Sequence, residues 1–490
     1  MILDPHAQVP PAEQLGRVHL IGIGGAGMSG IARILLARGL AVSGSDAKDS
    51  AAVAALRALG AHVDVGHAAA QVDGAQTVVV STAVRDSNPE LVEARRLGLR
   101  VLHRSQALVA VMQGRRVAAV AGTHGKTTTT SMLTVALQTC GADPSFAIGG
   151  ELAAGGANAH DGTGDVFVAE ADESDESFLL YTPDVAIVTN VEADHLDHYG
   201  TVEAVANAFD AFCDRVVPGG LLVACVDDPG VVTMLDRAGA RLAGRGVRVR
   251  RYGRTEGADV RIGPIDSGPT GTRFDLTTAE GDHHEVHLRV AGEHNALNAT
   301  AAWIAAVDLG LPASAVLEGL EVFTGARRRF EPRGSAAGVR VVDDYAHHPT
   351  EVRAVLRAAR TVVGSGRLVA VFQPHLFSRT RIFAHDFGEA LGLADDVVVL
   401  DVYPAREDPE PGVTGALVAA EVPLPPGRVA FVPSWSQVAA EVMGRVRVGD
   451  LVLTIGAGDV TMLGPEILRA LADADALVTR ARDLPELGED

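Results

Sequence analysis

Short runs of Val, Ile and Leu alternate with longer Ala- and Leu-rich stretches along almost the whole chain. The apolar runs include "TVVV", "DVFVA", "DVAIV", "LLVAC", "RLVAVF" and "LVLTI". Strands that alternate with helical stretches form βαβ units, and such units assemble into parallel sheets. This alternation therefore predicts an α/β protein.

The chain of 490 residues is long enough for about three domains, at roughly 150 residues per domain. The first predicted block, residues 1–112, contains "RVHLIGIGGAGMSGIARILLARGLAVSGSD", which predicts strand, glycine turn, helix and strand. The second, 113–332, opens on "GRRVAAVAGTHGKTTTT" and contains a Gly- and Asp-rich β region around 250–290 and a helix at "HNALNATAAWIAAVDLG". The third, 333–490, holds strands at "VRVVDDYA", "RLVAVFQP", "DVVVLDVY", "RVAFVP" and "DLVLTIGAGD", and we expect the acidic end "ARDLPELGED" to fray.

Charge and composition exclude several classes of partner. With 62 acidic and 42 basic residues the net charge is −20, which disfavours nucleic acid and anionic membranes as partners. No apolar run reaches the ~18 residues of a membrane span, and the N-terminal residues lack a signal-peptide pattern. Three scattered cysteines predict no disulfide framework or thiolate zinc site. We expect a cytoplasmic protein that meets anionic ligands through local loops, helix N-termini or a metal ion.

The segment "VAGTHGKTTTT" (120–130) follows an apolar strand and precedes a helix, and this is the context of a phosphate-binding loop. Of the 42 basic residues only Lys48 and Lys126 are lysines. A lysine is a compact point charge that fits among phosphate oxygens where a planar guanidinium is too wide. We expect Lys126 to hold a triphosphate and the hydroxyl of Thr127 to ligate Mg²⁺. The alternative is a Thr-rich helix start with a chance Gly-Lys pair, because Val120 stands where the general motif has glycine.

Acidic and polar side chains follow two other predicted strands, in "VFVAEADESDESF" and "IVTNVEADHLDHYG". The carboxyl ends of parallel strands share one edge of a sheet, and Mg²⁺ prefers oxygen ligands there. Glu170 follows its strand directly, so we expect it to be a metal ligand. His195 is a second candidate for this metal site, although Mg²⁺ prefers oxygen ligands. For most of the other acids we expect a solvated acidic loop.

"GIGGAGMSG" (22–30) is similar to a dinucleotide-binding fingerprint, and Asp46 stands at the end of the next strand, where an acid meets a ribose. Alone, this pattern favours a nicotinamide-dependent dehydrogenase. The second phosphate loop and the absence of hydride-transfer motifs favour a UDP-type ligand instead.

Together these segments resemble the Mur ligase family. The resemblance rests on "GIGGAGMSGIA", "SGSD", "STAV", "AGTHGKTTTT", "EADESDESF", "NVEADHLDHYG", "GEHNALNA", "DDYAHHPTEV" and "QPHLFSRT", in this order over nearly the whole chain. It implies an N-terminal Rossmann-like domain for a UDP-sugar, a central ATP-binding domain and a C-terminal Rossmann-like domain that closes over both.

The resemblance also implies roles for individual residues. ATP would be bound by Gly122, Thr123, His124, Gly125, Lys126, Thr127, Thr128, His294, Asn295, Asn298, Arg329 and Asp344. Its metal ion would be bound by Thr127, Glu170 and His195. The UDP-sugar would meet Gly22, Gly24, Gly25, Gly27, Met28, Ser29, Asp46, His67, Ser81 and Thr82. The acceptor amino acid would meet Tyr345, His347, His348, Arg379 and Arg381, and the catalytic set would be Lys126, Glu170, His195, Arg329, His347 and Arg379.

The implied reaction is that of the alanine-adding branch. With ATP and Mg²⁺ (or Mn²⁺), L-alanine would be joined to the lactyl carboxylate of UDP-N-acetylmuramate through an acyl phosphate, and His347 or His348 is the expected base. We expect a monomer or a weak homodimer. Two departures matter: no lysine follows Lys126, so a carboxylated lysine near the metal is excluded, and Leu376 replaces a common arginine, which shifts amino-acid recognition to Arg379 or Arg381.

Several alternatives stay open. A ligase that recycles murein tripeptide onto the same UDP-sugar shares most of these motifs, and a non-catalytic P-loop switch would bind nucleotide without turnover. In the third block, "DDYAHHPTEV" is also compatible with a plain helix start, with Pro349 early in the helix and Asp343 or Asp344 near the cap. "HLFSRTR" is also compatible with a solvated basic loop.

Overall fold

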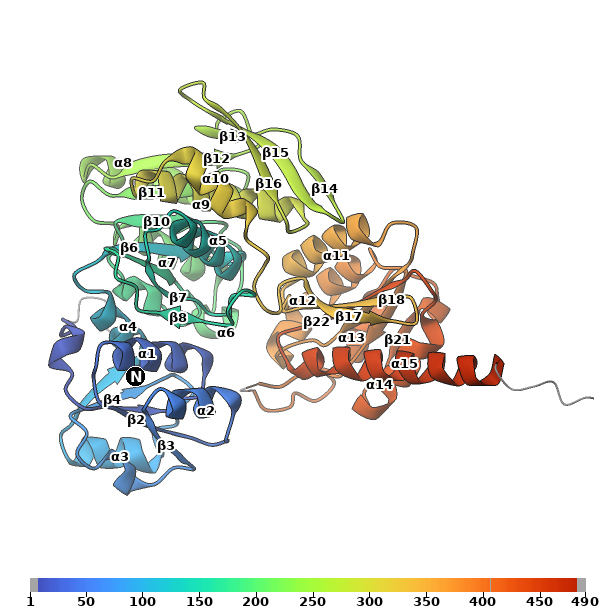
Figure 1. Ribbon diagram of the computed structural model, residues 1–490, viewed down its shortest axis with the longest axis horizontal. Helices are drawn as coiled ribbons and strands as arrows, with labels where there is room; N and C mark the ends of the chain where they lie inside the picture. Colours follow the sequence, from blue (N-terminus) through green and yellow to red (C-terminus); the bar gives the residue numbers. More distant parts are fainter. Residues whose placement is uncertain (1–7, 406, 483–490) are drawn as a thin grey trace, which may run out of the picture. The chain divides into compact units, whose positions relative to one another are not determined.

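The computed structural model describes residues 8–405 and 407–482, except for the side chains of Asp197 and of residues 477–482. The described chain divides into two compact units (Figure 1). The first takes in the chain up to Ile265 together with Arg273–Arg289 and Asn295–Ala326. The second takes in Asp266–Thr272, Val290–His294 and the chain from Arg327. The predicted fraying end falls mostly at 483–490, outside the described residues.

A five-stranded, fully parallel sheet begins the first unit. Its order is β3-β2-β1-β4-β5, so the chain winds outward from β1 in both directions. The strands are β1 Val18–Ile21, β2 Val42–Asp46, β3 His62–Val65, β4 Thr77–Val80 and β5 Arg100–His103. The helices are α1 Ala26–Ala37, α2 Ala51–Ala58, α3 Pro89–Arg96 and α4 Arg104–Met112, with short 3-10 turns η1 Ala12–Gln14 and η2 Ala69–Val72. A doubly wound sheet of this kind binds ligands beyond its strand carboxyl ends, next to β1 and β4.

A second, larger sheet follows in the same unit, in the order β15-β13-β12-β11-β10-β6-β9-β7-β8, with β16 paired to β15. Its strands are β6 Arg116–Ala121, β7 Ser145–Ala147, β8 Ala159–His160, β9 Val166–Glu170, β10 Val185–Val188, β11 Leu221–Cys225, β12 Arg248–Gly253, β13 Val260–Ile262, β15 Gly271–Thr278 and β16 His283–Leu288. Its helices are α5 Lys126–Thr139, α6 Leu196–Tyr199, α7 Val202–Cys213, α8 Pro229–Gly244, α9 Glu293–Asp308 and α10 Ala313–Glu321, with η3 Ser177–Leu180. Strands β6, β9, β10 and β11 run parallel, so their carboxyl ends form one edge.

The second compact unit contains a six-stranded sheet in the order β17-β18-β22-β19-β20-β21, parallel except for the edge strand β17. The strands are β17 Glu331–Ala336, β18 Val339–Asp344, β19 Leu368–Phe372, β20 Asp396–Val399, β21 Val429–Phe431 and β22 Leu451–Ile455, and β14 Asp266–Gly268 also falls in this unit. The helices are α11 Pro349–Val363, α12 Phe377–Leu391, α13 Gly415–Glu421, α14 Trp435–Arg445 and α15 Leu463–Arg482, with η4 Pro426–Arg428 and η5 Asp459–Met462.

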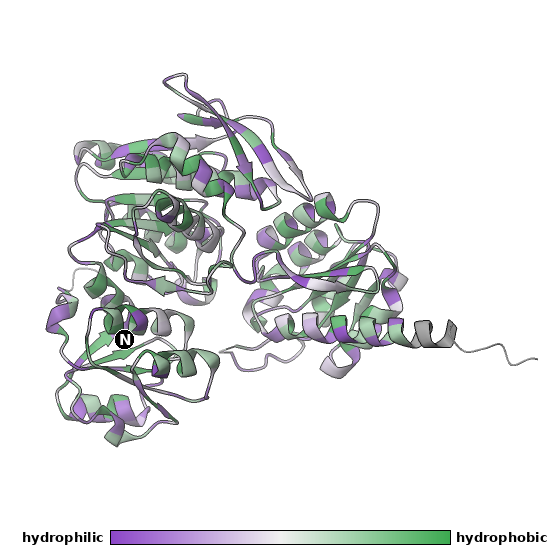
Figure 2. Cartoon of the chain, in the orientation of Figure 1, coloured by the Kyte–Doolittle hydropathy of each residue, from purple (hydrophilic) through white to green (hydrophobic). Residues whose placement is uncertain are grey.

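The strands in the middle of the sheets are largely hydrophobic (Figure 2). Successive side chains along a strand point to opposite faces of its sheet. In β19, Leu368, Ala370 and Phe372 pack with helices α11, α12 and α13. Val369 and Val371 face the other way, where α14 and α15 cover the sheet. A strand buried on both faces must be apolar at every position, which is why the sequence of β19 is an unbroken apolar run.

One apolar core continues from the first sheet into the second. It includes Leu20 of β1, Ile31 of α1, Ala159 of β8 and Phe167 of β9. Helix α1 makes the connection: a Cβ on Gly30 would lie 3.1 Å from the Cβ of Ala159. This continuity explains why the first two sheets form one compact unit.

The predicted fold class is confirmed: three regions of α/β structure are each built on a mainly parallel sheet. The predicted strands and the helix at 293–308 are present. The boundaries at 112/113 and 332/333 stay a prediction. No helix among the described residues is both long and apolar enough to span a membrane.

Candidate active site

The segment between β6 and α5 has the backbone of a phosphate-binding loop. Gly122 has φ 130°, and Gly125, the N-cap of α5, is left-handed with φ 81°. A Cβ on Gly122 would lie 2.0 Å from Thr189 Oγ1, and one on Gly125 would lie 2.7 Å from Asn298 Oδ1. Both positions therefore require glycine for space as well as for conformation.

Lys126, the first residue of α5, is held at the mouth of this loop. Its ammonium group donates to the carbonyl oxygens of Gly122 (2.7 Å) and Thr123 (3.1 Å) and pairs with Glu173 at 2.8 Å. Burial works to lower the pKa of Lys126, but the neighbouring Glu173 and Asp172 outweigh it and raise that pKa. The ammonium group therefore stays charged, as phosphate binding requires.

The loop that follows β10 supports the phosphate loop from the neighbouring strand. The side chain of Asn190 accepts a hydrogen bond from the backbone N–H of His124 at 2.7 Å, and Thr189 donates to the carbonyl of His124 at 2.6 Å. Thr123 bonds the backbone N–H of Glu192 at 2.9 Å. The sequence analysis placed polar groups here but did not assign them this supporting role.

Two of the predicted metal ligands lie together beside Lys126. The hydroxyl of Thr127 is 3.1 Å from Glu170 Oε1, and the other carboxylate oxygen accepts from the backbone N–H of Gly149 at 2.8 Å. A Cβ on Gly149 would lie within 3.0 Å of this carboxylate, so the close approach needs glycine. A hydroxyl and a carboxylate are hard oxygen donors, and this set fits Mg²⁺.

His195, the third predicted ligand, lies beside Glu173 and Asp194, with ring nitrogen Nε2 3.7 and 3.8 Å from their carboxylate oxygens. Its backbone is left-handed, with φ 53°. A non-glycine residue is strained in this conformation, so tertiary contacts must hold the ring in place. Its imidazole nitrogen suits Mg²⁺ less well than the two oxygen donors do.

The expectation of a solvated acidic loop is wrong for Glu173 and Asp194, which are 1% and 5% exposed. Burial raises the pKa of Glu173 to about 7; Lys126 opposes this rise and Asp172 adds to it. Asp172 pairs with Arg104 at 3.1 Å. Only the fold reveals this burial, because Lys126 and Glu173 are far apart in sequence and meet where β6 and β9 end side by side.

A cleft of about 660 Å³ lies at the carboxyl edge of the first sheet. Seven of the residues predicted to meet a UDP-sugar line it: Gly22, Gly25, Gly27, Met28, Asp46, His67 and Ser81. Of the other three, Gly24 donates its N–H to Asp46 at 2.9 Å, Ser29 is buried in α1, and Thr82 is exposed. The predicted glycine loop and acid thus lie on one cleft.

A buried carboxylate, Glu90, fixes one wall of this cleft. It is fully buried and bonds His19 (2.6 Å), Ser45 (2.7 Å) and His67 (2.7 Å). Burial works to raise the pKa of Glu90, but the hydrogen bonds from His19, Ser45 and His67 outweigh it and lower that pKa. His67 reaches the cleft, so the charge on Glu90 orients a ligand-facing ring. Glu90 was not among the predicted site residues; it lies in the first turn of α3, directly after the loop that follows β4.

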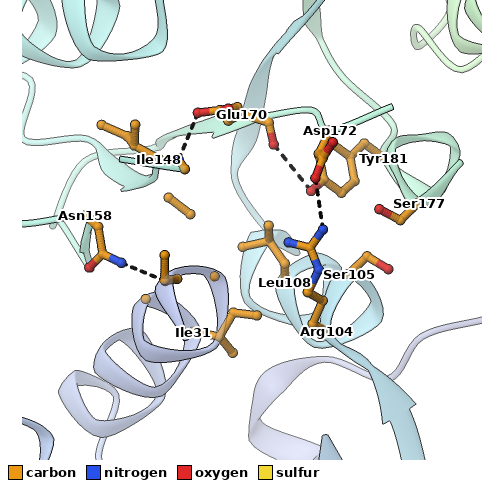
Figure 3. A pocket seen from close by; sticks show the side chains of 15 residues that line it. Ile31, Arg104, Ser105, Leu108, Ile148, Asn158, Glu170, Asp172, Ser177 and Tyr181 are labelled. Atoms are coloured by element: carbon orange, nitrogen blue, oxygen red, sulfur yellow. Dashed lines mark hydrogen bonds and ion pairs between the residues drawn. The ribbon is translucent and has the colours of Figure 1, made fainter. Parts of the chain in front are cut away.

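A second, smaller cavity lies between the first two sheets (Figure 3). Its lining includes Glu170 and Asp172 from the second sheet, Asn158 beside α1, and Arg104 at the start of α4. Asn158 donates to the carbonyl of Ala26 at 2.7 Å.

The residues predicted to lie near the adenine divide between the two units. In the first unit, Asn298 lies against Gly125 and donates to the side chain of Asn295 at 3.3 Å. In the second, burial and the nearby Arg329 lower the pKa of His294 to about 4, so its ring is neutral at pH 7. Asp344 accepts from the backbone N–H groups of Phe330 and Ala346, both at 2.7 Å, and burial raises its pKa to about 6 against the effect of Arg329.

Aromatic rings and imidazoles gather at the carboxyl edge of the third sheet. Tyr345 is covered by the guanidinium groups of Arg328 and Arg329, at 4.6 and 5.3 Å from its ring centre. His347 lies 5.4 Å from the ring of Tyr345 and 6.0 Å from that of His375, which stacks on Tyr403. His375 is in the segment "QPHLF", but the sequence analysis did not select it.

The helix start predicted as the alternative for "DDYAHHPTEV" is also present. Pro349 is the first residue of α11, but the cap is His348 rather than Asp343 or Asp344, and Glu351 bonds back to its N–H at 3.3 Å. On α12, Arg379 is buried at 5% exposure, which contradicts a solvated basic loop at that position. Arg381 is exposed and pairs with Glu410 at 3.1 Å. Arg379 is therefore better placed than Arg381 for a specific contact.

These features define a class of protein: an α/β protein with a phosphate-binding loop, a magnesium-compatible Thr–Glu pair and a separate nucleotide-type cleft in one unit. Comparison with known proteins shows the family. The chain matches the Mur ligase family catalytic domain over residues 17–116, the Mur ligase middle domain over 120–306 and the Mur ligase glutamate ligase domain over 328–458. The chain belongs to the Mur ligase family, as the sequence analysis predicted.

Two curated relatives resemble nearly the whole chain. UDP-N-acetylmuramate–L-alanine ligase of Saccharopolyspora erythraea is 61% identical over 471 residues, which is 95% of each chain. The protein of the same name from Kineococcus radiotolerans is also 61% identical, over 95% of this chain and 98% of its own.

Solved structures agree with this relationship. The UDP-N-acetylmuramate-alanine ligase of Thermotoga maritima superimposes with a TM-score of 0.77 at 29% identity, over 94% of this chain and 99% of its own. A murein peptide ligase from Psychrobacter arcticus superimposes with a TM-score of 0.70 at 25% identity, with the same coverage.

Proposed function

We propose that this protein is an ATP-dependent ligase that joins L-alanine to the lactyl carboxylate of UDP-N-acetylmuramate and releases ADP and phosphate. The observation that supports this most directly is the cluster of Lys126, Thr127 and Glu170 at the phosphate loop, in the same compact unit as a cleft suited to a nucleotide diphosphate. The 61% identity to relatives that bear this ligase name agrees with it.

The chemistry begins with a carboxylate, which does not accept an amine unaided because its oxygen is a poor leaving group. A lactyl carboxylate oxygen attacks the γ-phosphorus of ATP, the bond from phosphorus to the β–γ bridging oxygen breaks, and ADP leaves with that electron pair. The product is an acyl phosphate. Phosphoryl transfer of this kind depends mainly on alignment and charge neutralisation.

The residues of the phosphate loop supply both the alignment and the charge neutralisation. Lys126 holds the β- and γ-phosphates, and the N–H groups of the loop and of the start of α5 point at the same oxygens. Thr127 and Glu170 would hold Mg²⁺, which neutralises phosphate charge when bound. His195, which lies beside Glu173, is proposed as the third ligand of the metal ion. Asn295 and Asn298 are proposed to meet the nucleoside end of ATP.

The second half of the reaction forms the amide. The free amine of L-alanine attacks the acyl carbon, and the tetrahedral intermediate expels phosphate with the electron pair of the carbon–oxygen bond. The proton lost by the alanine ammonium needs a base, and we assign His347, whose ring lies in the cluster at the third sheet, ahead of His348, which caps α11. Arg379 is assigned to the alanine carboxylate, Arg329 to the γ-phosphate, and His294 and Asp344 to the nucleoside of ATP.

We further propose that the enzyme acts in the cytoplasm, where its nucleotide and amino-acid substrates are available, and has no nucleic acid or membrane partner. We propose that it acts as a monomer or weak homodimer. A ligase that attaches murein tripeptide is the alternative, because a solved murein peptide ligase shares the fold.

The deciding experiment measures phosphate release with ATP, Mg²⁺ and UDP-N-acetylmuramate, with each amino acid or the murein tripeptide supplied in turn. We expect L-alanine to give the highest kcat/KM. Preferred use of the tripeptide would replace the proposal by its alternative, and no ADP formation with either acceptor would refute the ligase assignment.

A further inference from the structure

The cleft on the first sheet and the small cavity that reaches Glu170 share part of their lining. Both are lined by Ala26, Gly27 and Arg104, and among the residues that the structure describes no other lines both. Beyond these residues the cleft extends to His67 and Ser81, and the small cavity extends to Glu170, which contacts Thr127 of the phosphate loop. An elongated ligand that ran from the cleft along this cavity to the phosphate loop would pass Arg104.

The side chain of Arg104 lies against the turn where a diphosphate would be bound. A Cβ on Gly27 would be 3.0 Å from Arg104 Nη1, so the guanidinium group occupies the space directly over the first turn of α1. The glycine loop from Gly22 to Gly30 contains no charged residue of its own. Arg104 is thus the cation that the first loop lacks, supplied by another helix.

The position of Arg104 is unfavourable for the helix that bears it. It is the first residue of α4, and a positive charge at a helix N-terminus opposes the helix dipole. Its charge is balanced by Asp172 at 3.1 Å (Figure 3). Asp175 is 4.0 Å away. About 28% of the side chain remains exposed, so a ligand can reach it.

Resting on the proposed function, we infer that Arg104 binds the diphosphate of the UDP-sugar, and that the diphosphate replaces Asp172 as the partner of its guanidinium group. A guanidinium group fits two phosphate oxygens with parallel hydrogen bonds, which a lysine cannot do. Asp172 keeps the guanidinium group in position before the ligand binds, and it competes with the diphosphate for that group. Arg104 therefore sets the affinity for the donor substrate and fixes the point from which its lactyl carboxylate extends toward Glu170.

The test compares Arg104→Gln, Arg104→Lys and Asp172→Asn by calorimetric titration with UDP, with ATP titrated in parallel. Loss of a charge-assisted bidentate contact predicts UDP binding roughly 10- to 100-fold weaker in R104Q, with an intermediate loss in R104K. ATP affinity in R104Q stays within about threefold of wild type, which shows that the unit is folded. The matched control is Arg96→Gln, which removes an exposed arginine that pairs with Glu93 on α3.

Asp172→Asn separates ligand binding from a purely structural role. Because it removes the competitor of the ligand, D172N keeps or strengthens UDP binding. If Arg104 only tied the loop at 172–175 to α4, R104Q and D172N would weaken UDP binding alike, and that result overturns the inference. UDP binding unchanged in R104Q overturns it as well.

The same proteins distinguish this inference from the proposed function. If wild-type protein forms ADP with UDP-N-acetylmuramate and alanine while R104Q retains full UDP affinity, the function stands and the inference fails. If R104Q loses UDP affinity but wild-type protein shows no turnover with any acceptor, the diphosphate contact stands and the ligase assignment fails. If wild-type protein binds no UDP, both fail.

Discussion

The turn after β1 and the turn after β6 occupy the same place in a strand–turn–helix unit but differ in backbone conformation and in electrostatics. The N-cap glycine is extended in the first, Gly25 with φ −64°, and left-handed in the second, Gly125 with φ 81°. In each, a glycine with positive φ follows the strand directly, Gly22 at 76° and Gly122 at 130°, and a helix begins within a few residues. The second turn contains its own cation, Lys126, which pairs with a buried acid. The first contains none and has Arg104 from a different helix against it. Two glycine turns at the same place in a strand–turn–helix unit can thus differ in the ligand they select, because the positive charge beside each turn comes from a different part of the fold.

The largest expected effect tests the cation inside the second turn. We expect Lys126→Ala to lower the rate of phosphate release about 10²- to 10³-fold, because the transferring phosphoryl group loses its fixed positive partner. The measurement is phosphate release with both substrates present. The chain offers a matched control, since Lys48 is its only other lysine and is exposed. Lys48→Ala should stay within twofold of wild type; a wild-type rate in K126A would contradict the loop assignment.

The second turn also differs from the first in having an acid opposite its hydroxyl. We expect Glu170→Gln to raise the Mg²⁺ concentration needed for half-maximal rate by about 10- to 100-fold, because a metal ligand loses its charge. The measurement is a Mg²⁺ titration of phosphate release at saturating ATP. Glu176→Gln, an exposed acid of the same loop, is the control. An unchanged Mg²⁺ requirement in E170Q would remove Glu170 from the metal site.

The two leading glycines give a matched pair. A Cβ on Gly22 meets no atom within 4 Å, so Gly22→Ala has only the strain of a positive φ, about 1–2 kcal/mol. A Cβ on Gly122 would overlap Thr189 Oγ1 at 2.0 Å and approach two backbone nitrogens. We therefore expect Gly122→Ala to lower the melting temperature more and to abolish measurable ATP binding. If both variants lowered the melting temperature equally, the second turn would be less tightly packed than its contacts indicate.

The smallest expected effect is on the pH dependence of stability. It contrasts two buried acids, Glu90, which bonds the cleft-lining His67, and Glu173, which pairs with Lys126. The raised pKa of Glu173, about 7 against an ordinary 4.5, means that the folded state holds a proton which the unfolded state releases. Its contribution to stability therefore falls as the pH rises from about 4.5 to 7. The pKa of Glu90 is lowered, so its contribution is present above 4.5 and is lost on acidification below that pH.

Melting temperatures of Glu173→Gln and Glu90→Gln across pH 4–8 measure this contrast. Relative to wild type, E173Q should gain stability by a few degrees as the pH rises from 4.5 to 7. E90Q should be least stable relative to wild type at neutral pH, and the gap should close in acid. If the melting temperatures of both variants, relative to wild type, changed with pH in the same way, the environments of Glu173 and Glu90 would be alike.

Local sequence pattern was sufficient for the strands, the glycine turns and the Thr127–Glu170 pair, because each depends on residues close in sequence or on the rule that parallel strands end at one edge. It was not sufficient for Glu90, Arg104 or Glu173. These residues look like ordinary surface charges in the sequence. Their burial and partners depend on packing with segments tens of residues away, such as Gly27 with Arg104.

Two further features, the cap of α11 and the role of Gly149, became visible only in the structure. The cap of α11 is His348, the residue before Pro349, while Asp343 and Asp344, which the alternative interpretation placed near the cap, end the strand β18. The role of Gly149 was also missed, since only the approach of its backbone to Glu170 shows that a side chain there would not fit.

Helix α1 has a consequence for inhibitor design. Its first turn lines the cleft on the first sheet, while Gly30 on the same helix packs on the strand β8 of the second sheet, within one apolar core. The spacing between the two glycine turns is therefore set by a rigid element and not by a flexible joint. A compound that binds both turns can therefore use a rigid linker of one fixed length. Such a linker would increase affinity because it loses little conformational entropy on binding.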